Sequence, residues 1–322
     1  MARADALRAD VREGARWSWG QRIKNDAIYM LAMGALAIAE RIPPRAAVWV
    51  GRWVGLAAWA AGARARRVAI ANVARVLPGV DAGSFVRRVY RALGERLGEA
   101  VAALDPARPL VALPFVPGAR ACLDDAIAEG RGVVFASAHL GPWERVAATL
   151  VAAGVPLTVV AREPYDPRFG RLYDRLRGAR GVKTVYRGAD GAGVRLVRVL
   201  RRGGVLGMPM DLASRVPSVT APFLGAPAPT AVGPARLALR TGAAVVVGAA
   251  TPDGIHFERI VVAPDDDEVA LTARINDALS ARIRAWPEAW PWMHARWQDN
   301  PVMLGPWRKR SRASSQASTS RS

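Results

Sequence analysis

Short apolar segments alternate with helical segments from residue 120 onward, and this alternation limits the possible folds more than any other feature. Apolar runs of strand length lie at 132–138, 156–161, 182–186, 205–211, 244–250 and 255–263. Segments with the apolar spacing of helices lie between them, such as 143–154 and 193–204. Strands joined by crossover helices form parallel pairs, so we expect an α/β fold with a mostly parallel central sheet flanked by helices.

Two apolar runs precede this region, at 27–39 and 46–63. The first is shorter than the roughly 20 residues that cross a bilayer, and Arg52 interrupts the second. Tryptophans at 49 and 53 suit the interface between lipid and water. We therefore predict N-terminal helices that associate with a membrane surface, although two buried helices of a soluble domain would give the same pattern.

Three regions follow from this pass along the chain. Residues 1–60 form the predicted membrane-associating helical region, and 61–304 form the main α/β domain. Residues 60–104, where that domain begins, are expected to be helical, with a break at Pro78-Gly79 and Ser84 as the N-cap of the second helix. Residues 305–322 are basic, rich in serine and nearly devoid of apolar side chains, so we expect a disordered tail.

The net charge of +19 is carried almost wholly by arginine and favours an anionic partner. Nucleic acid, an anionic membrane face and phosphorylated substrates all fit such a charge. The arginines are dispersed, however, and aromatic residues do not alternate with them on the predicted strands, which argues against nucleic acid. The single cysteine, Cys122, excludes a disulfide framework, and no Cys/His spacing indicates a metal site.

His139 is one of only three histidines and follows the predicted strand 132–138. Ligands gather at the carboxyl ends of parallel strands. Pro142 suits the first turn of the next helix, which places Glu144 in that turn. The chain could fold back so that the carboxylate orients the imidazole, leaving the other ring nitrogen to remove a proton. A capping histidine beside a surface glutamate is the alternative.

Two other strand ends carry charged residues. Arg162 could bind a phosphate through paired guanidinium donors, or it could form a surface ion pair with Glu163. Asp211 could contribute to a site, or it could serve as a turn or cap residue. The helical segment 167–181 is basic and amphipathic, so it predicts either a surface for anionic partners or a solvated face. Its arginines are Arg168, Arg171, Arg175, Arg177 and Arg180.

The stretch from His139 to Glu144 resembles the His-x4-Asp/Glu motif of the bacterial lipid A biosynthesis acyltransferases, the lauroyl/myristoyl transferase family. Further segments resemble that family in the same order, namely "RRVAIANVARVLPG", "LTVVARE", "RLYDRLRGARG", "PFLGAPAPTAVG" and "PEAWPWMHARWQDNP". The resemblance covers roughly residues 20 to 304. Two segments differ from the family pattern: "PMDLA" replaces Pro-Asp-Gln, and "PFLG" has one phenylalanine where two are usual.

The resemblance implies a glycerol-phosphate-acyltransferase-like fold and an acyltransferase domain over 61–304. It implies transfer of a fatty acyl chain from an acyl carrier protein or coenzyme A thioester to a hydroxyl of a lipid A precursor or related glycolipid. His139 would be the base and Glu144 its partner. Residues of other motifs would bind substrate, namely Arg162, Asp211, Gly225 and Thr230. From the residues themselves, Thr230 could cap the following helix or lie in a plain loop, and His294 is expected to be structural and not a second base.

The same resemblance implies no metal and no cofactor beyond the thioester co-substrate. The implied partners are acyl carrier protein, an anionic glycolipid or phospholipid acceptor, and the cytoplasmic face of the cell inner membrane, with no nucleic acid. Other functions remain open at this point. They are acyl transfer to a phosphoinositide mannoside, an ornithine lipid or a lysophospholipid, and non-catalytic binding of lipid or nucleic acid.

Overall fold

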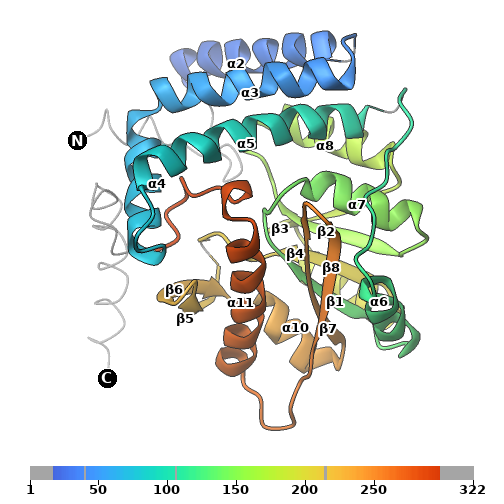
Figure 1. Ribbon diagram of the computed structural model, residues 1–322. Helices are drawn as coiled ribbons and strands as arrows, with labels where there is room; N and C mark the ends of the chain where they lie inside the picture. The colour runs from blue at the N-terminus through green and yellow to red at the C-terminus, as the bar shows by residue number, and fades with distance from the viewer. Residues whose placement is uncertain (1–16, 40, 106, 214–215, 298–322) are drawn as a thin grey trace, which may run out of the picture.

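The computed structural model describes residues 17–39, 41–105, 107–213 and 216–297, so the predicted basic tail lies outside the described residues. A six-stranded sheet with the order β3-β2-β4-β1-β7-β8 forms its centre (Figure 1). Neighbouring strands are parallel except for β7 and β8, which are antiparallel. The strands are β1 (Val133–Ser137), β2 (Leu157–Arg162), β3 (Lys183–Arg187), β4 (Val205–Pro209), β7 (Ala244–Thr251) and β8 (Gly254–Ile260). The predicted mostly parallel sheet is therefore confirmed.

Helices cover both faces of this sheet. One face carries α6 (Ala119–Ala128) and α7 (Trp143–Ala152), with α8 (Pro167–Gly178) beside α7. The other carries α9 (Ala192–Arg201), α10 (Gly233–Thr241) and α11 (Glu268–Ala285). Because side chains alternate along a strand, Val133 and Phe135 of β1 enter one hydrophobic core while Val134 and Ala136 enter the other. This double burial explains why the strand is a continuous apolar run.

A two-stranded ribbon, β5 (Ser218–Phe223) and β6 (Ala226–Ala231), lies outside the main sheet. Its strands contain Pro222, Pro227 and Pro229, although proline cannot donate a hydrogen bond to a strand ladder. Leu224 and Gly225 form its tight turn with φ angles of 52° and 88°. Polar side chains of α11 help to hold the ribbon, since Ser280 accepts a hydrogen bond from the Leu224 amide at 2.9 Å.

Two helices precede the α/β region, α4 (Ala63–Val76) and α5 (Ala82–Leu104). The predicted break at Pro78-Gly79 is present, and Gly79 has a φ of 86° that favours glycine. The predicted N-cap is wrong, because Asp81 caps α5 instead of Ser84. The Asp81 carboxylate accepts the amide protons of Gly83 and Ser84, which are two of the donors that a helix start leaves free.

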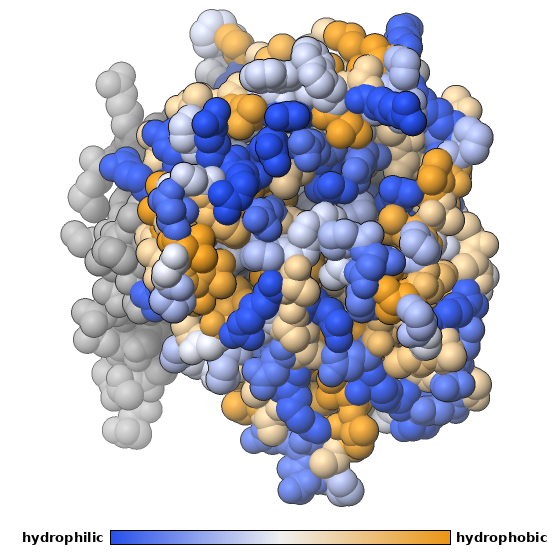
Figure 2. All heavy atoms as spheres, viewed as in Figure 1, coloured by the Kyte–Doolittle hydropathy of each residue, from blue (hydrophilic) through white to orange (hydrophobic). Residues whose placement is uncertain are grey.

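The two N-terminal apolar runs form α2 (Trp19–Ala39) and α3 (Pro44–Ala61), which lie beside α5 on one side of the α/β region (Figure 1). Many of their large apolar side chains are exposed to solvent. Among the described residues no helix has both the length and the apolar character needed to cross a bilayer. Figure 2 shows apolar side chains at the surface over these helices, next to charged ones.

Glycines allow α3 and α5 to pack with their backbones almost in contact. Gly51 and Gly55 of α3 face Gly94 and Gly98 of α5. A Cβ atom at Gly94 would lie within 2.9 Å of the Gly55 Cα and closer still to the Gly51 carbonyl oxygen. Contacts of this closeness are open only to glycine, so this face of α5 fixes the position of α3.

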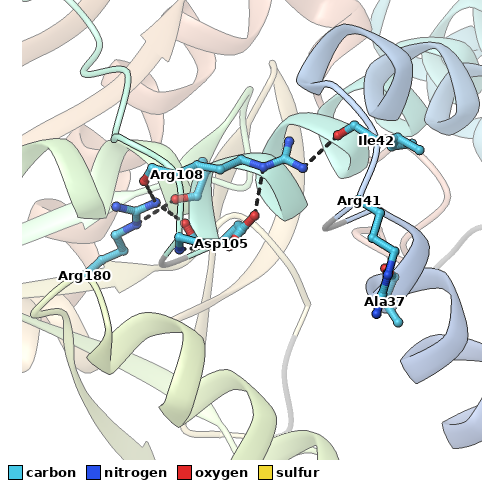
Figure 3. A network of polar contacts seen from close by, with 8 residues as sticks. Ala37, Arg41, Ile42, Asp105, Arg108 and Arg180 are labelled. Atoms are coloured by element: carbon cyan, nitrogen blue, oxygen red, sulfur yellow. Dashed lines mark hydrogen bonds and ion pairs between the residues drawn. The ribbon is translucent and has the colours of Figure 1, made fainter.

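Arginine side chains connect the N-terminal helices to the rest of the domain (Figure 3). The Arg108 guanidinium forms a 2.8 Å ion pair with Asp105 after α5 and donates to the Ile42 carbonyl between α2 and α3 at 2.7 Å. The Arg180 guanidinium donates to the Ala103 and Arg108 carbonyls at 2.9 and 2.8 Å. The segment after α8 is thereby attached to the end of α5.

We expect Gly94→Ala to lower the free energy of unfolding by about 1–3 kcal/mol, since the added methyl group would force α3 away from α5. Gly34→Ala is the matched control. It places the same methyl group in α2, where a Cβ would meet nothing within 4 Å. The control should be neutral or should stabilise by up to about 1 kcal/mol, because alanine favours a helix more than glycine. Urea unfolding of both variants measures the difference, and equal midpoints would contradict the proposed contact.

Candidate active site

His139 and Asp211 form a hydrogen-bonded pair at the carboxyl ends of two neighbouring central strands. The His139 Nδ1 lies 2.9 Å from Asp211 Oδ1. The backbone amide of His139 donates to Asp211 Oδ2 at 2.9 Å, and the Trp290 indole donates to the same oxygen at 2.7 Å. The Asp211 side chain is wholly buried, whereas that of His139 is 31% exposed. The carboxylate is thus fully engaged while one side of the imidazole remains open.

Electrostatics around this pair favour an ionised Asp211. Burial alone would raise the pKa of Asp211, but the His139 ring and the donated hydrogen bonds outweigh it and lower that pKa. An ionised carboxylate only accepts, so the His139 Nδ1 carries the proton and Nε2 is left as the basic nitrogen. Burial lowers the pKa of His139, but the charge and hydrogen bond of Asp211 outweigh it and raise that pKa above 6.5.

The local sequence explains why His139 lies where it does. β1 pairs with β4, and the ladder continues to the amide of Met210, which donates to the Ser137 carbonyl at 3.1 Å. This pairing brings the residues that follow both strands side by side. Gly141 then turns the chain with a φ of 63°, and an added Cβ would lie 2.7 Å from the Trp286 ring. The turn brings the Trp143 ring edge-on to His139, with ring centroids 5.4 Å apart.

Glu144 does not orient the histidine, contrary to the prediction. It lies in the first turn of α7 as expected, but its carboxylate oxygens accept two hydrogen bonds from Arg177 of α8, at 3.0 and 2.5 Å. Both side chains are largely buried, at 13% and 14% exposure. Asp211 occupies the position beside the ring because β4 ends next to β1. Glu144 still raises the pKa of His139 through its charge.

A large cavity opens beside His139. Its volume is about 1380 Å³, and its walls come from the carboxyl ends of the strands and from α2, α3, α5 and α8. Most of the lining is apolar, as with Leu36, Val54, Leu97 and Phe169. Val54 is 50% exposed to solvent as well as lining the cavity. The cavity therefore connects the imidazole with the exposed apolar side chains of the N-terminal helices.

Arg162 and Asp211 both lie at this end of the sheet, as predicted from their positions after strands. Arg162 ends β2 and lines the cavity. Asp211 lies behind His139, so its carboxylate reaches the imidazole rather than an arginine or open solvent. His294 also lines the cavity, where burial lowers the pKa of His294 and the charge of His139 lowers it further.

Gly225 and Thr230 occupy structural positions, and neither lines the cavity. Gly225 belongs to the turn of the β5–β6 ribbon. Thr230 is wholly buried, and its hydroxyl oxygen accepts hydrogen bonds from Asn276 at 3.0 Å and from Arg296 at 2.7 Å. Thr230 does not cap α10 either, because the N-cap position belongs to Val232. The geometry gives these two residues a role in holding the ribbon.

The predicted basic helix divides its arginines between two uses. Arg177 pairs with Glu144, and Arg180 donates to backbone carbonyls. Arg168 joins α8 to α2 through a 2.6 Å ion pair with Asp26, and its guanidinium lies 4.5 Å from the centre of the Tyr29 ring. Only Arg171 and Arg175 among them are exposed. The helix surface that an anionic partner could reach is therefore much smaller than the sequence suggests.

Other contributors to the site could not be identified from spacing. Trp290 reaches Asp211 across 79 residues of sequence, and Asn72 of α4 donates to the carbonyls of Trp292 and His294 at 2.8 Å each. Two family motifs in the sequence pointed to these residues: the aromatic motif "PEAWPWMHARWQDNP" contains Trp290, and "RRVAIANVARVLPG" contains Asn72. Both motifs matter because they hold the C-terminal segment under the histidine pair.

We expect the two carboxylates to affect the His139 pKa unequally. In Asp211→Asn, burial is no longer outweighed by the adjacent charge and hydrogen bond, so the His139 pKa should fall below 6.5. Glu144→Gln is the matched change at a carboxylate that acts only through its charge, and it should lower the pKa less. An NMR titration of the imidazole Cε1 proton measures both. A larger fall of the His139 pKa in Glu144→Gln than in Asp211→Asn would contradict the His139–Asp211 pairing and favour the His139–Glu144 pairing predicted from sequence.

The sequence of this chain matches one family model and is similar to known acyltransferases. The family model for bacterial lipid A biosynthesis acyltransferase matches residues 16–299. The chain is also similar to the protein named phosphatidylinositol mannoside acyltransferase in two strains of Mycobacterium tuberculosis, at 29% and 28% identity over 187 residues. The similar stretch spans 54% of this chain and 57% of each relative, so the match covers just over half of their length. Because the family model spans most of its residues, this chain belongs to the bacterial lipid A biosynthesis acyltransferase family.

Proposed function

We propose that this chain transfers a fatty acyl group from a thioester to a hydroxyl of an anionic glycolipid, with His139 as general base and Asp211 as the residue that orients it. The observation that carries the proposal is the His139–Asp211 hydrogen bond at the end of an apolar cavity. A positioned base can remove the proton of the acceptor hydroxyl, the carboxylate can orient that base, and the apolar cavity can hold the acyl chain. Family membership supports the same reaction class.

The proposed reaction proceeds through a tetrahedral intermediate. The unprotonated Nε2 of His139 removes the proton of the acceptor hydroxyl as its oxygen attacks the thioester carbonyl carbon. Asp211 stabilises the imidazolium that forms, because its carboxylate is already hydrogen-bonded to Nδ1. When the intermediate collapses, the carbon–sulfur bond breaks and the imidazolium returns its proton to the leaving thiolate. The products are an ester and a free thiol, and no acyl-enzyme is formed.

The cavity suits acyl chains because its walls are mostly apolar and lie directly beside the base. Leu97 and Val101 of α5 and Leu172 of α8 are among the residues that line it. Burial of each methylene group there contributes about 0.8 kcal/mol, so a chain in the cavity would be held strongly. The exposed apolar side chains where α2 and α3 border the cavity would let a lipid enter from a bilayer without crossing water.

Two acceptors have specific support. The family model favours a lipid A precursor, and the mycobacterial relatives favour a phosphatidylinositol mannoside. Both are anionic lipids with sugar hydroxyls, so they make similar demands on the site. For the donor we propose acyl carrier protein, with coenzyme A thioesters as the alternative. Arg171 and Arg175 on the exposed side of α8 would meet the acidic surface of the carrier.

We further propose that the chain acts on the cytoplasmic face of the inner membrane, held there by α2 and α3. Large apolar side chains that are normally buried are more than half exposed on these helices. They are Trp19, Met30, Leu31, Ile38, Trp49 and Trp53. A bilayer surface would cover them, and the arginines of the neighbouring segments would meet anionic headgroups.

Substitutions at the histidine pair should abolish turnover without unfolding the chain. We expect His139→Ala and Asp211→Asn each to lower kcat by roughly a thousandfold or more, since the base is lost in one and its tautomer in the other. In the wild-type protein kcat/KM should fall as the pH drops through a His139 pKa above 6.5, because only the neutral imidazole can accept the proton. Acyl transfer to each acceptor, followed by mass spectrometry, measures these effects.

Asp277→Asn is the matched control for this experiment, since it removes an exposed carboxylate of α11. Its rate and pH profile should equal those of the wild type. Normal turnover in His139→Ala would disprove the proposed base. Normal turnover in Asp211→Asn alone would show that the ring needs no orienting carboxylate.

Membrane association should depend on the exposed tryptophans. We expect Trp53→Gln to lower affinity for vesicles of phosphatidylglycerol and phosphatidylethanolamine by about tenfold, because a large apolar side chain no longer enters the bilayer. Val194→Gln is the control, because this side chain is 63% exposed but belongs to α9, away from α2 and α3. Vesicle flotation measures both, and equal binding of the two variants would exclude α3 as the membrane contact.

A further inference from the structure

Two arginines lie side by side at the carboxyl edge of the sheet. Arg162 ends β2 and Arg187 ends β3, and the parallel register of these strands pairs the two residues directly. Both line the cavity that contains His139. The two guanidinium groups therefore start from neighbouring strands at the same edge of the cavity.

Arg187 differs from two other cavity arginines in its partners. Arg177 is neutralised by Glu144, and Arg236 is neutralised by Glu268 through hydrogen bonds of 2.6 and 2.7 Å. Within the part of the chain that the structure describes, Arg187 forms no ion pair with a carboxylate. Burial lowers the pKa of Arg187, and the neighbouring Arg162 charge lowers it further. A half-buried cation that no carboxylate neutralises is costly, because burial removes the water that would solvate its charge.

We propose that Arg162 and Arg187 together form a binding site for a phosphate group of the substrate. This inference rests on the proposed function and adds a charged recognition element to it. Two guanidinium groups offer several donors in fixed planes, which suits the oxygens of a phosphate diester or monoester. A phosphate held between them would bring a negative charge to the half-buried Arg187 guanidinium, which no carboxylate of the described residues neutralises.

The strand order sets the distance between this site and the base. β1, β4, β2 and β3 are successive neighbours, and adjacent strands lie about 4.8 Å apart. Arg162 therefore starts about 10 Å from the strand that carries His139, and Arg187 starts about 15 Å from it. A glycolipid in which sugar rings separate the reacting hydroxyl from a phosphate would span this interval. The phosphate of a thioester donor is the other possible occupant, because its pantetheine arm also separates thioester and phosphate.

Binding measurements in the His139→Ala background test the site without turnover. One pair of probes is dihexanoyl phosphatidylinositol and dihexanoylglycerol, which differ in the phosphate headgroup. The second pair is coenzyme A and pantetheine. We expect Arg187→Gln and Arg162→Gln each to weaken binding of one phosphate-bearing probe by about tenfold or more, and to leave its neutral counterpart unchanged. Calorimetry at constant ionic strength provides the affinities.

Arg201→Gln is the matched control, because this arginine ends α9, is exposed and does not line the cavity. It changes the net charge equally and should leave all four affinities unchanged. Weaker binding of the phosphoinositide assigns the site to the acceptor, and weaker binding of coenzyme A assigns it to the donor. Unchanged affinity for both phosphate-bearing probes in Arg187→Gln would overturn the proposal.

Kinetics separate this inference from the proposed function. In otherwise wild-type protein, Arg187→Gln should raise KM for the phosphate-bearing substrate about tenfold while kcat stays near the wild-type value, because the arginine is remote from the reacting atoms. Absence of any acyl transfer by the wild type would remove the proposed function and leave the binding result standing. Full turnover with unaltered KM in Arg187→Gln would remove the phosphate site and leave the function standing.

Discussion

The buried carboxylate of Asp211 is the interaction on which the site depends. It accepts hydrogen bonds from the His139 ring, the His139 backbone amide and the Trp290 indole, so three distant parts of the chain, around residues 139, 211 and 290, meet at this carboxylate. A buried charge without such partners would cost several kcal/mol, so the fold tolerates Asp211 only when β1, β4 and the C-terminal segment are all in place. The same bonds that make the carboxylate tolerable also fix the tautomer of the imidazole. The same hydrogen bonds of Asp211 therefore contribute both to the stability of the fold and to the basicity of the His139 Nε2.

The N-terminal helices and the ends of the strands together form the cavity. The strand ends supply His139 and Arg162, but much of the apolar wall around them comes from α2, α3 and α5. The glycine contact between α3 and α5 determines the position of α3 in that wall, because two helices whose backbones are nearly in contact can shift little relative to each other. The residues that shape the cavity and those exposed to solvent belong to the same helices. The proposed lipid-binding slot would make use of this arrangement.

Arginine serves several purposes in this chain, and its abundance alone therefore says little about partners. Arg108 and Arg180 connect backbone segments, as Figure 3 shows. Arg296 is buried over the Phe223 ring, 4.2 Å from its centre, and burial lowers the pKa of Arg296 to about 10. Such internal arginines are solvated by carbonyls and aromatic faces instead of water. Arg162 and Arg187 differ from these arginines because they are register partners on the neighbouring strands β2 and β3 and both line the cavity.

The sequence by itself determined the α/β architecture, because apolar strands buried on both faces leave a pattern that few other folds produce. It also located His139 and Asp211 at strand ends, and family motifs indicated the reaction class. Only the tertiary structure decided which carboxylate meets the imidazole. Glu144 is near His139 in sequence, whereas Asp211 is 72 residues away, and the pairing of β1 with β4 made the distant residue the neighbour. The β5–β6 ribbon could not be predicted either, because its prolines are unusual in strands. Side chains of α11, Ser280 and Asn276, stabilise the ribbon through hydrogen bonds that no local sequence pattern indicates.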